Sequence, residues 1–215
     1  MIGPIMIGPS SSHTAGVVRI GNVFHQLVSN SARKVEVTFY NSFATTFKGH
    51  GSDRAIVGGI LGYKPSDERI KESVEFAKGE GYLINFKTVG NSSTMHPNSI
   101  MLETVIEDKQ YSLLGESLGG GVINVARVND YKSSFDGSLQ TLIIEAVDKP
   151  GVIAFVADVL AHDGANIASM TVSRKARHGT ACHIVEVDNP VRTTTVHYLK
   201  SFDWINSLTI LESIS

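Results

Sequence analysis

Hydrophobic residues near the start of the chain change from helical spacing to strand alternation. Val17, Ile20, Phe24 and Leu27 recur every three or four residues, which predicts a helix with one buried face. Residues 34–40 alternate between apolar and polar side chains, and this period of two predicts a half-buried strand. We therefore expect a first helix that leads directly into a sheet.

The next segment continues this mixture of helices and strands. The predicted helices and their candidate caps are 55–61 with Ser52 or Asp53, and 66–78 with Ser66 or Asp67. The predicted strands are 82–89, 99–107, 110–116 and 122–128, the second and third of which form a hairpin. Three consecutive glycines at 119–121 interrupt the pattern and predict a bulge or a close approach of the backbone to another group, with simple flexibility as the alternative.

The last third of the chain predicts strand, helix, strand, strand, helix, strand, the ferredoxin-like βαββαβ order. The strands are 139–147, 167–173, 181–187 and 208–214; one helix has an apolar stripe from Val152 to Leu160, and the other spans 193–205 with Val196, Leu199 and Trp204 inward. Residues 129–138 are small and polar and suggest no element, so we place the boundary between domains 1–130 and 139–215 there. The predicted fold class is α+β.

Composition narrows the class of protein. Hydrophobic residues make up 42% of the 215 residues and charged residues 19%, a balance that allows globular cores. The net charge of −2, without a long basic run, argues against a nucleic-acid partner. No stretch reaches the roughly 20 apolar residues of a membrane-spanning helix, and residues 1–9 lack the charged start and cleavage site of a signal peptide. We expect a cytoplasmic protein.

Metal chemistry has little support on this chain. Cys182 is the only cysteine, so the chain can form no internal disulfide and cannot hold an iron–sulfur cluster alone. His50 and His96 stand without a cysteine or a close second histidine, which is poor spacing for a metal site. No metal ligand is therefore predicted.

Polar residues gather just before the first predicted helix, in the run Ser10, Ser11, Ser12, His13 and Thr14. Ser11 or Ser12 is the predicted N-cap. A helix start has unpaired backbone N–H groups and a partial positive charge, so it attracts carboxylates and phosphates. His13 adds a group that titrates near neutrality. The run therefore predicts an anion site, with an ordinary polar cap as the alternative.

Two further polar segments carry histidines. Residues 48–54 place His50 before the second helix, and a polar loop contains His96 and Asn98. A plain glycine turn with a cap is the alternative for the first segment. Ser12 and His13 are adjacent, whereas hydrolase triads draw their members from distant segments, and the chain has no Gly-x-Ser-x-Gly elbow. Both observations disfavour a hydrolase.

The last third of the chain resembles an ACT domain. Beyond the element order, the likeness lies in Asp-Lys-Pro-Gly at 148–151, before the first helix, and Gly-Ala-Asn-Ile at 164–167, after it. ACT domains commonly pair through their sheets, and many bind a small amino acid at the seam. The resemblance implies a homodimer and the ligand positions Asp148, Gly164 and Asn166. A purely structural or dimerising module is the alternative.

The first domain resembles the beta chain of bacterial iron–sulfur L-serine dehydratases. Four stretches carry the likeness, in this order ahead of the ACT-like domain: residues 8–16, 49–54, 96–98 and 117–121. The resemblance implies a mixed α/β beta-type domain and an alpha-chain partner whose cysteines hold a [4Fe-4S] cluster. It also implies that L-serine is dehydrated to pyruvate and ammonia.

Roles for individual residues follow from this resemblance. Iron on the alpha chain would take up the charge of the leaving hydroxyl, while this chain holds the substrate carboxylate. The catalytic candidates are His13, His50 and His96, and the substrate-binding candidates are Ser10, Ser11, Ser12, Thr14 and Asn98. The general base stays open among the histidines and the partner chain. A regulatory reading also stays open, because the same kind of domain is an allosteric anion-binding unit in some phosphoglycerate dehydrogenases.

Overall fold

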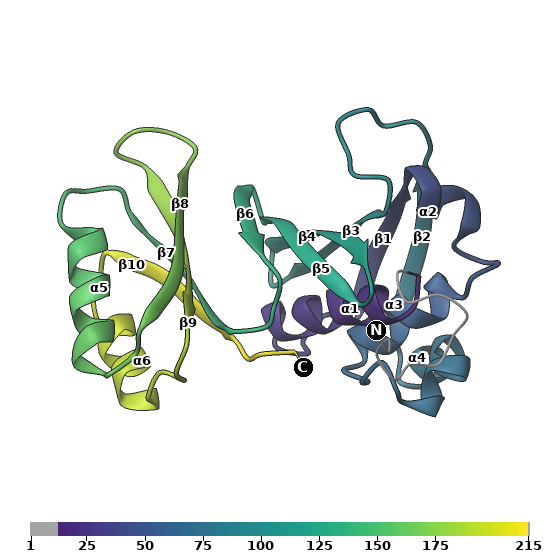
Figure 1. Cartoon of the computed structure of the whole chain (residues 1–215), viewed down its shortest axis with the longest axis horizontal. Coiled ribbons are helices and arrows are strands. Elements are labelled where there is room, and N and C mark those ends of the chain that lie inside the picture. Colours follow the sequence, from purple (N-terminus) through teal and green to yellow (C-terminus); the bar gives the residue numbers. More distant parts are fainter. Residues whose placement is uncertain (1–12, 215) are drawn as a thin grey trace. The chain divides into compact units, whose positions relative to one another are not determined.

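A computed structural model describes residues 13–214 and divides the chain into two compact units, which meet in sequence at Asn129 and Asp130 (Figure 1). Helices and two sheets make up the chain, which confirms the α+β prediction. Within the described residues, no helix combines the length and the apolar character that crossing a bilayer requires.

The first unit contains the elements of a mixed α/β domain. In order they are α1 (Ala15–Leu27), β1 (Lys34–Tyr40), α2 (Asn41–Thr46), α3 (Ser52–Ile60), the 3₁₀ helix η1 (Glu68–Glu72), α4 (Ser73–Gly79), β2 (Leu83–Val89), β3 (Ser99–Ile106), β4 (Lys109–Gly119) and β5 (Val122–Val128). η1 and α4 replace the single helix predicted over 66–78. Asp67 caps η1, as predicted, by accepting the backbone N–H of Arg69.

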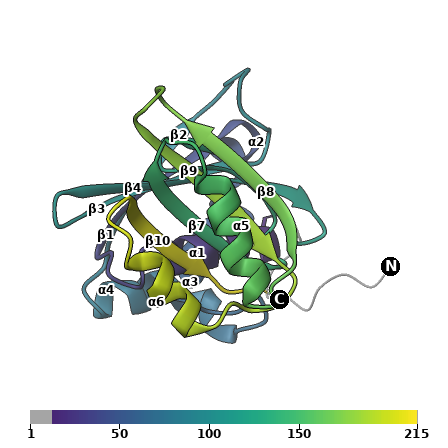
Figure 2. The same ribbon diagram turned by 90° about the vertical axis from the view of Figure 1, so that its left-hand side faces the viewer.

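The strands of this unit lie in the order β2-β1-β3-β4-β5 within a six-stranded sheet. β1 pairs with β2 in parallel, whereas the pairs from β1–β3 to β4–β5 are antiparallel. A parallel pair needs a long crossover, and the chain from α2 to α4 provides it. Figures 1 and 2 show α1, α3 and α4 gathered on one side of these strands.

α1 and α3 lie side by side, run in the same direction and touch at two glycines. A Cβ added to Gly59 would lie 2.3 Å from the carbonyl oxygen of Val18, and one added to Gly21 would lie 2.8 Å from the Cα of Gly59. The Asn22 amide also donates to the carbonyl oxygens of Gly59 and Tyr63 at 3.1 and 3.0 Å. This contact fixes the two helices relative to each other and holds their N-terminal ends together.

The first predicted cap is wrong. α1 begins at Ala15 with Thr14 at the N-cap, and the Thr14 side chain makes no capping hydrogen bond. Ser11 and Ser12, which were predicted to cap this helix, lie outside the described residues. The helix therefore begins later than the spacing of its serines suggests.

The cap of α3 also differs from the prediction. Gly51 occupies the N-cap with a φ of +73°, a conformation that residues with a Cβ rarely adopt. Ser52 and Asp53 are instead the first residues of the helix. The Ser52 hydroxyl donates to the carbonyl oxygen of His13 at 3.1 Å, so it joins two segments instead of closing its own helix.

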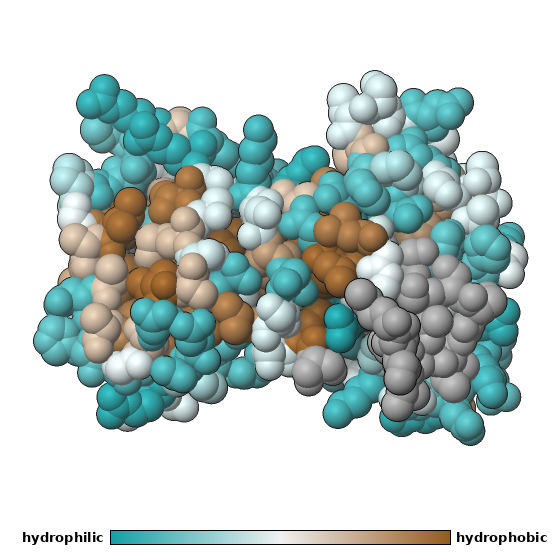
Figure 3. Space-filling model, in the orientation of Figure 1, coloured by the Kyte–Doolittle hydropathy of each residue, from teal (hydrophilic) through white to brown (hydrophobic). Residues whose placement is uncertain are grey.

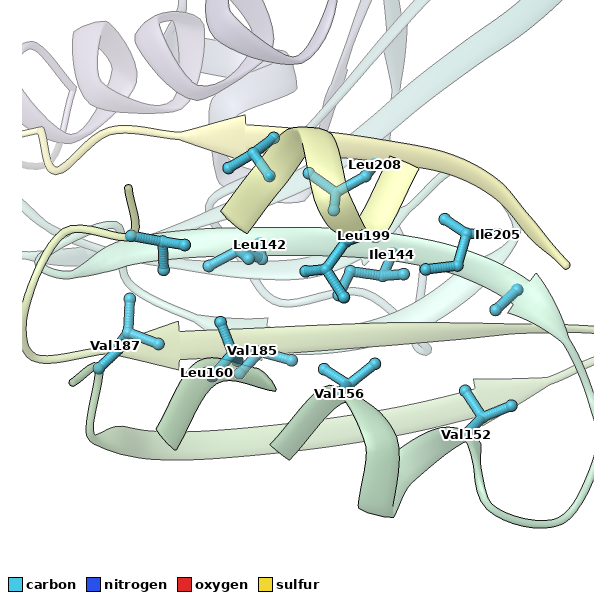
Figure 4. Packing of buried hydrophobic residues seen from close by; sticks show 14 residues of the cluster. Leu142, Ile144, Val152, Val156, Leu160, Val185, Val187, Leu199, Ile205 and Leu208 are labelled. Atoms are coloured by element: carbon cyan, nitrogen blue, oxygen red, sulfur yellow. The ribbon is translucent and has the colours of Figure 1, made fainter. Parts of the chain in front are cut away.

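The second unit contains β6 (Tyr131–Phe135), β7 (Gln140–Val147), α5 (Val152–His162), β8 (Ile167–Arg174), β9 (Thr180–Val187), α6 (Thr193–Lys200) and β10 (Ile205–Leu211). Its sheet runs β10-β7-β9-β8 with every neighbouring pair antiparallel. From β7 onward this is the βαββαβ order that the pattern predicts. Figure 4 shows apolar side chains of the strands and of both helices meeting in one core.

The last predicted helix is wrong at its C-terminal end. α6 ends at Lys200 and β10 begins at Ile205, so Trp204 lies outside the helix. Its ring packs against those of Phe155 and Phe202, with centroids 5.2 and 5.4 Å apart. The aromatic residues of this turn have the same spacing as the apolar face of a helix, and the predicted helix was therefore too long.

Residues 129–138 contain a strand that the sequence did not suggest. In β6 the side chains alternate between buried and exposed, and Tyr131 and Phe135 are buried. The Ser173 hydroxyl of β8 donates to the carbonyl oxygen of Lys132 at 3.0 Å, which fixes β6 beside the second sheet. The serine, lysine and aspartate residues make the segment polar overall, so its short alternation is not recognisable from the sequence.

Candidate functional site

His13 lies directly before α1 and is held by the segment that follows β1. Its Nε2 is 3.1 Å from the Thr46 hydroxyl. Its ring centroid is 4.6 Å from that of His50 and 4.9 Å from that of Phe43, both in edge-on arrangements. Two histidines that the sequence proposes separately, His13 and His50, are therefore in contact.

This environment favours the neutral form of His13. Burial lowers the pKa of His13 below its usual value of 6.5, and the nearby charge of His50 lowers it further. A neutral imidazole has one nitrogen that can accept a proton. His13 is therefore electrostatically suited to act as a general base near neutral pH.

Thr14 places a buried hydroxyl at the start of α1. Thr14 is only 2% exposed, and within residues 13–214 its Oγ1 has no hydrogen-bond partner. Buried hydroxyls are nearly always paired, because an unpaired one keeps the cost of losing water. Together with the N–H groups of the helix start, this hydroxyl can serve a bound anion.

The beginnings of α1 and α3 lie next to each other, because the Ser52 hydroxyl binds the His13 carbonyl oxygen. Each helix start contributes partial positive charge. The first turn of α3 contains Asp53, whereas the first turn of α1 contains no acidic residue. The start of α1 is thus the more electropositive of the two and the better place for a carboxylate.

Helix α2, which the sequence did not predict, connects this region to the loop between β2 and β3. The Asn41 amide donates to the carbonyl oxygens of Ser92 and Met95, both at 3.0 Å, and its carbonyl oxygen accepts the Ser92 N–H at 2.7 Å. The Ser42 N–H donates to the carbonyl oxygen of Pro97 at 3.0 Å. The loop with the His96 and Asn98 candidates is therefore attached to the helix that contacts His13.

His96 and Asn98 form one unit within that loop. The Nδ1 of His96 accepts the backbone N–H of Asn98 at 3.2 Å. The carbonyl oxygen of Asn98 accepts the N–H of Ser117 at 3.0 Å, and Ser117 lies so close to α1 that a Cβ on Gly16 would be 2.2 Å from its Oγ. The loop therefore approaches the first turn of α1 through Ser117.

The three glycines form the turn between β4 and β5. Gly119, Gly120 and Gly121 all have positive φ, and the pairing of the two strands shifts between Ser117 and Gly119, which confirms the predicted bulge. The Arg19 guanidinium donates to the carbonyl oxygen of Gly121 at 3.0 Å. The turn is thus fixed to α1, one helical turn beyond the candidate site.

The candidates in the second unit do not come together. Asp148 precedes α5, whereas Gly164 and Asn166 follow it, and an 11-residue helix separates them by about 16 Å. The Arg174 guanidinium, which donates to Asp148 at 2.7 Å, lowers the pKa of that carboxyl. The Asn166 amide donates to Asp188 at 2.6 Å. One small ligand cannot touch both ends of α5 in a single chain.

The described residues offer no place for an iron–sulfur cluster. Residues 13–214 contain no group of three or more histidine, cysteine or acidic side chains arranged to hold a metal ion. Cys182 is buried in β9, and burial raises the pKa of its thiol to about 12. A thiol of this kind stays protonated and is a poor cluster ligand.

Sequence reasoning found the histidines but missed the residues that join them. Asn41, Ser42 and Thr46 belong to a six-residue helix with a single buried side chain, and such a helix has no apolar period to detect. The available sequence signal for this helix was the four-residue separation of Ser42 and Thr46, which is about one helical turn. Ser10, Ser11 and Ser12 were predicted to bind substrate and lie outside the described residues, so their roles stay predictions.

Comparison with known proteins gives a consistent result. The family described as serine dehydratase beta chain matches residues 2–127. The chain is 40% identical over 192 residues to the L-serine dehydratase beta chain of Peptoniphilus asaccharolyticus, covering 89% of this chain and 86% of that protein. It is 41% identical over 191 residues, with the same coverage, to the probable L-serine dehydratase beta chain of Bacillus subtilis.

A more distant similarity reaches a different enzyme. The chain is 25% identical over 193 residues to the D-3-phosphoglycerate dehydrogenase of Methanocaldococcus jannaschii, and this match covers 89% of the chain but only 36% of that protein. A stretch similar in sequence to most of this chain therefore occurs inside a larger protein of another class.

Proposed function

Because this chain belongs to the family of L-serine dehydratase beta chains, we propose that it supplies the carboxylate-binding site of a two-chain enzyme that converts L-serine to pyruvate and ammonia. The partner is an alpha chain, as the name beta chain implies for the relatives. The dehydration is a lyase reaction in amino-acid breakdown, and we place it in the cytoplasm.

One observation carries the proposal: the buried Thr14 hydroxyl at the start of α1, which has no hydrogen-bond partner among residues 13–214. A carboxylate bound there accepts this hydroxyl and the N–H groups of the helix start. The positive end of the helix dipole favours its charge. It also steadies the negative charge that builds up beside the carboxylate when Cα loses its proton.

The reaction needs a base for that proton. His13 is adjacent to Thr14 and is kept neutral by burial and by His50, so it accepts the Cα proton. The β-hydroxyl leaves as hydroxide, and a cluster on the alpha chain would supply the Lewis acid that takes up its charge. The aminoacrylate that results tautomerises to an imine, and water hydrolyses the imine to pyruvate and ammonia. His50, His96 and Asn98 orient the substrate or relay protons around this step.

A [4Fe-4S] cluster does not fit residues 13–214, because they contain no group of side chains arranged to hold a metal ion and their single cysteine, Cys182, is buried. We therefore assign the cluster of this family to the alpha chain. The contribution of this chain is to bind the acid group, to accept the proton and to surround the substrate.

Reconstitution tests the proposal. The chain is expressed anaerobically with and without a candidate alpha chain, and pyruvate formation from L-serine is measured. Turnover should require both chains, and His13→Ala in the complex should lower it by about 100-fold or more. Full turnover by the His13→Ala complex would contradict the assignment.

A regulatory role is the second candidate, favoured by the similarity to D-3-phosphoglycerate dehydrogenase. On this reading the start of α1 binds an effector anion and no hydroxyl is eliminated. Calorimetry would then find L-serine binding to the chain, while no combination with an alpha chain would produce pyruvate.

We also propose that the second unit is an ACT domain that pairs with a second copy. β8 forms one edge of its sheet, and Figure 3 shows apolar surface in the region of α5 and β8, where Ile153 and Val172 are exposed. Pairing would let Asp148 of one copy and Asn166 of the other share an amino-acid ligand. Sedimentation of the wild type and of Val172→Lys tests this: the variant should shift toward monomer.

A further inference from the structure

The side chain of Ser52 is fully buried at the start of α3. Its hydroxyl donates to the backbone carbonyl oxygen of His13 at 3.1 Å. Because a carbonyl oxygen can only accept, the direction of this bond does not depend on the protonation state of any side chain. The first residue of α3 is therefore bound to the backbone of His13, 39 residues earlier in the chain.

This bond acts on both residues of the candidate site through one peptide group. The carbonyl group of His13 and the N–H group of Thr14 belong to the same peptide unit, which is planar and rigid. Holding the oxygen therefore also limits the direction of the Thr14 N–H and the positions of both Cα atoms. His13 is the proposed base and Thr14 the proposed carboxylate ligand, so a single hydroxyl controls the backbone geometry of both.

A second contact lies further along the same two helices. A Cβ added to Gly59 would lie 2.3 Å from the carbonyl oxygen of Val18, and the Asn22 amide donates to the carbonyl oxygen of Gly59 at 3.1 Å. This crossing holds α1 against α3 but leaves the start of α1 free to turn about it. The Ser52 hydroxyl opposes that turn at the end of the helix where the candidate site lies.

We propose that Ser52 is a positioning residue of the dehydration: it keeps the peptide between His13 and Thr14 in the orientation that binds the carboxylate and accepts the proton. This inference rests on the proposed function for its catalytic consequence. Its structural part, the orientation of that peptide, rests on the hydrogen bond. Ser52 acts through the peptide and not on the substrate.

Ser73 provides a matched control. It is also a fully buried serine, and its hydroxyl donates to the backbone carbonyl oxygen of Arg54 at 2.7 Å. This bond joins the start of α4 to α3 and involves neither His13 nor Thr14. Ser52→Ala and Ser73→Ala should both lower the stability of the chain, because each leaves a buried carbonyl oxygen without its donor.

Kinetics of the two-chain enzyme separate positioning from general destabilisation. Ser52→Ala should lower kcat/KM for L-serine by about tenfold or more, with a lower kcat and a higher KM, because the base and the carboxylate ligand are both displaced. Ser52→Cys keeps nearly the volume of serine but has only a weak donor, so its kcat/KM should lie between those of Ser52→Ala and the wild type. Ser73→Ala should retain the wild-type kcat and KM.

Nuclear magnetic resonance of the isolated chain tests the structural part without turnover. The carbonyl carbon resonance of His13 should move to lower frequency in Ser52→Ala and Ser52→Cys, as expected when a carbonyl group loses a hydrogen bond, and should stay in place in Ser73→Ala.

Two results would overturn the inference. One is wild-type kinetics in both Ser52 variants, and the other is an equal loss of kcat/KM in Ser52→Ala and Ser73→Ala. If the assembled wild-type enzyme turns over no serine at all, the proposed function fails, while the His13 carbonyl resonance still decides whether Ser52 holds this peptide.

Discussion

A hydroxyl buried without a hydrogen bond costs a folded protein about 1–3 kcal/mol, and the Thr14 hydroxyl at the start of α1 has no partner in the part of the chain that the structure describes. A carboxylate that accepts this hydroxyl removes the cost at the moment of binding. On the proposed function, the site would give up some stability and gain affinity for an acid group. His13, the residue before it, is half-buried, and its lowered pKa favours the neutral form.

Titration of His13 should appear in the stability of the protein. Because burial lowers its pKa below 6.5, the unfolded chain binds the proton more tightly than the folded chain. The stability that neutral His13 contributes is present above about pH 6.5 and is lost as the pH falls from there toward the lowered pKa. In denaturant titrations between pH 7.5 and 5, His13→Gln should lose less stability than the wild type.

A second buried histidine, His183, also affects the pH dependence of stability in that experiment. Burial lowers the pKa of His183 as well, so it contributes with the same sign and accounts for part of the loss that remains in His13→Gln. Removing both histidines should flatten the curve further. An unchanged loss of stability in His13→Gln would show that His13 does not titrate as its surroundings require.

The sequence predicts each candidate residue but not their contacts. His13 and His50 could be proposed because each precedes an apolar helix, a pattern that local spacing reveals. Their ring contact depends on α2 and on the glycine crossing of α1 and α3, which join positions more than 30 residues apart. The burial of Thr14 is likewise invisible locally, since threonine is a common surface residue.

At the scale of elements, the crossing of α1 and α3 decides where the site lies. Gly59 approaches the backbone of Val18 more closely than any side chain would permit. The Ser52 hydroxyl then joins the two helix starts. A shift of either helix along this contact would separate His13 from its partners.

Gly59→Ala should therefore destabilise the first unit. The added Cβ meets backbone atoms, which cannot move aside as a flexible side chain can, so the loss should be at least about 1–3 kcal/mol in unfolding experiments. Gly79→Ala is the control, because a Cβ at Gly79 meets nothing within 4 Å. That variant should be neutral or slightly more stable, since alanine favours a helix. Equal effects of the two changes would contradict the close crossing.

Elements with a strong apolar period were predicted well, and short or mixed elements were not. The strands and first helix of the second unit follow alternation or a buried stripe. α2 has one buried residue, Phe43, and β6 hides its alternation among serines and a lysine. Where packing against other segments stabilises an element, its own sequence carries little signal.

At the scale of the molecule, the two units hold different chemistry. The first contains His13 with its lowered pKa, the Thr14 hydroxyl that has no partner among the described residues, and the adjoining starts of α1 and α3. In the second, Asp148 and Asn166 are engaged in contacts within the unit. No cluster site exists within the described part of either unit. We therefore expect substitutions in the first unit to change the stability of the chain and the turnover of the two-chain complex independently of each other.

The most direct test of carboxylate binding at the start of α1 is the Michaelis constant for L-serine of the two-chain enzyme carrying Thr14→Val. Losing a hydrogen bond to a charged group should lower kcat/KM by about 10- to 100-fold, mainly through KM, while the chain itself becomes more stable. Thr104→Val is the matched control, because the Thr104 hydroxyl is buried but donates to the Lys34 carbonyl oxygen at 2.6 Å; it should lower stability and leave KM unchanged. A Thr14→Val enzyme with the wild-type KM would contradict the account.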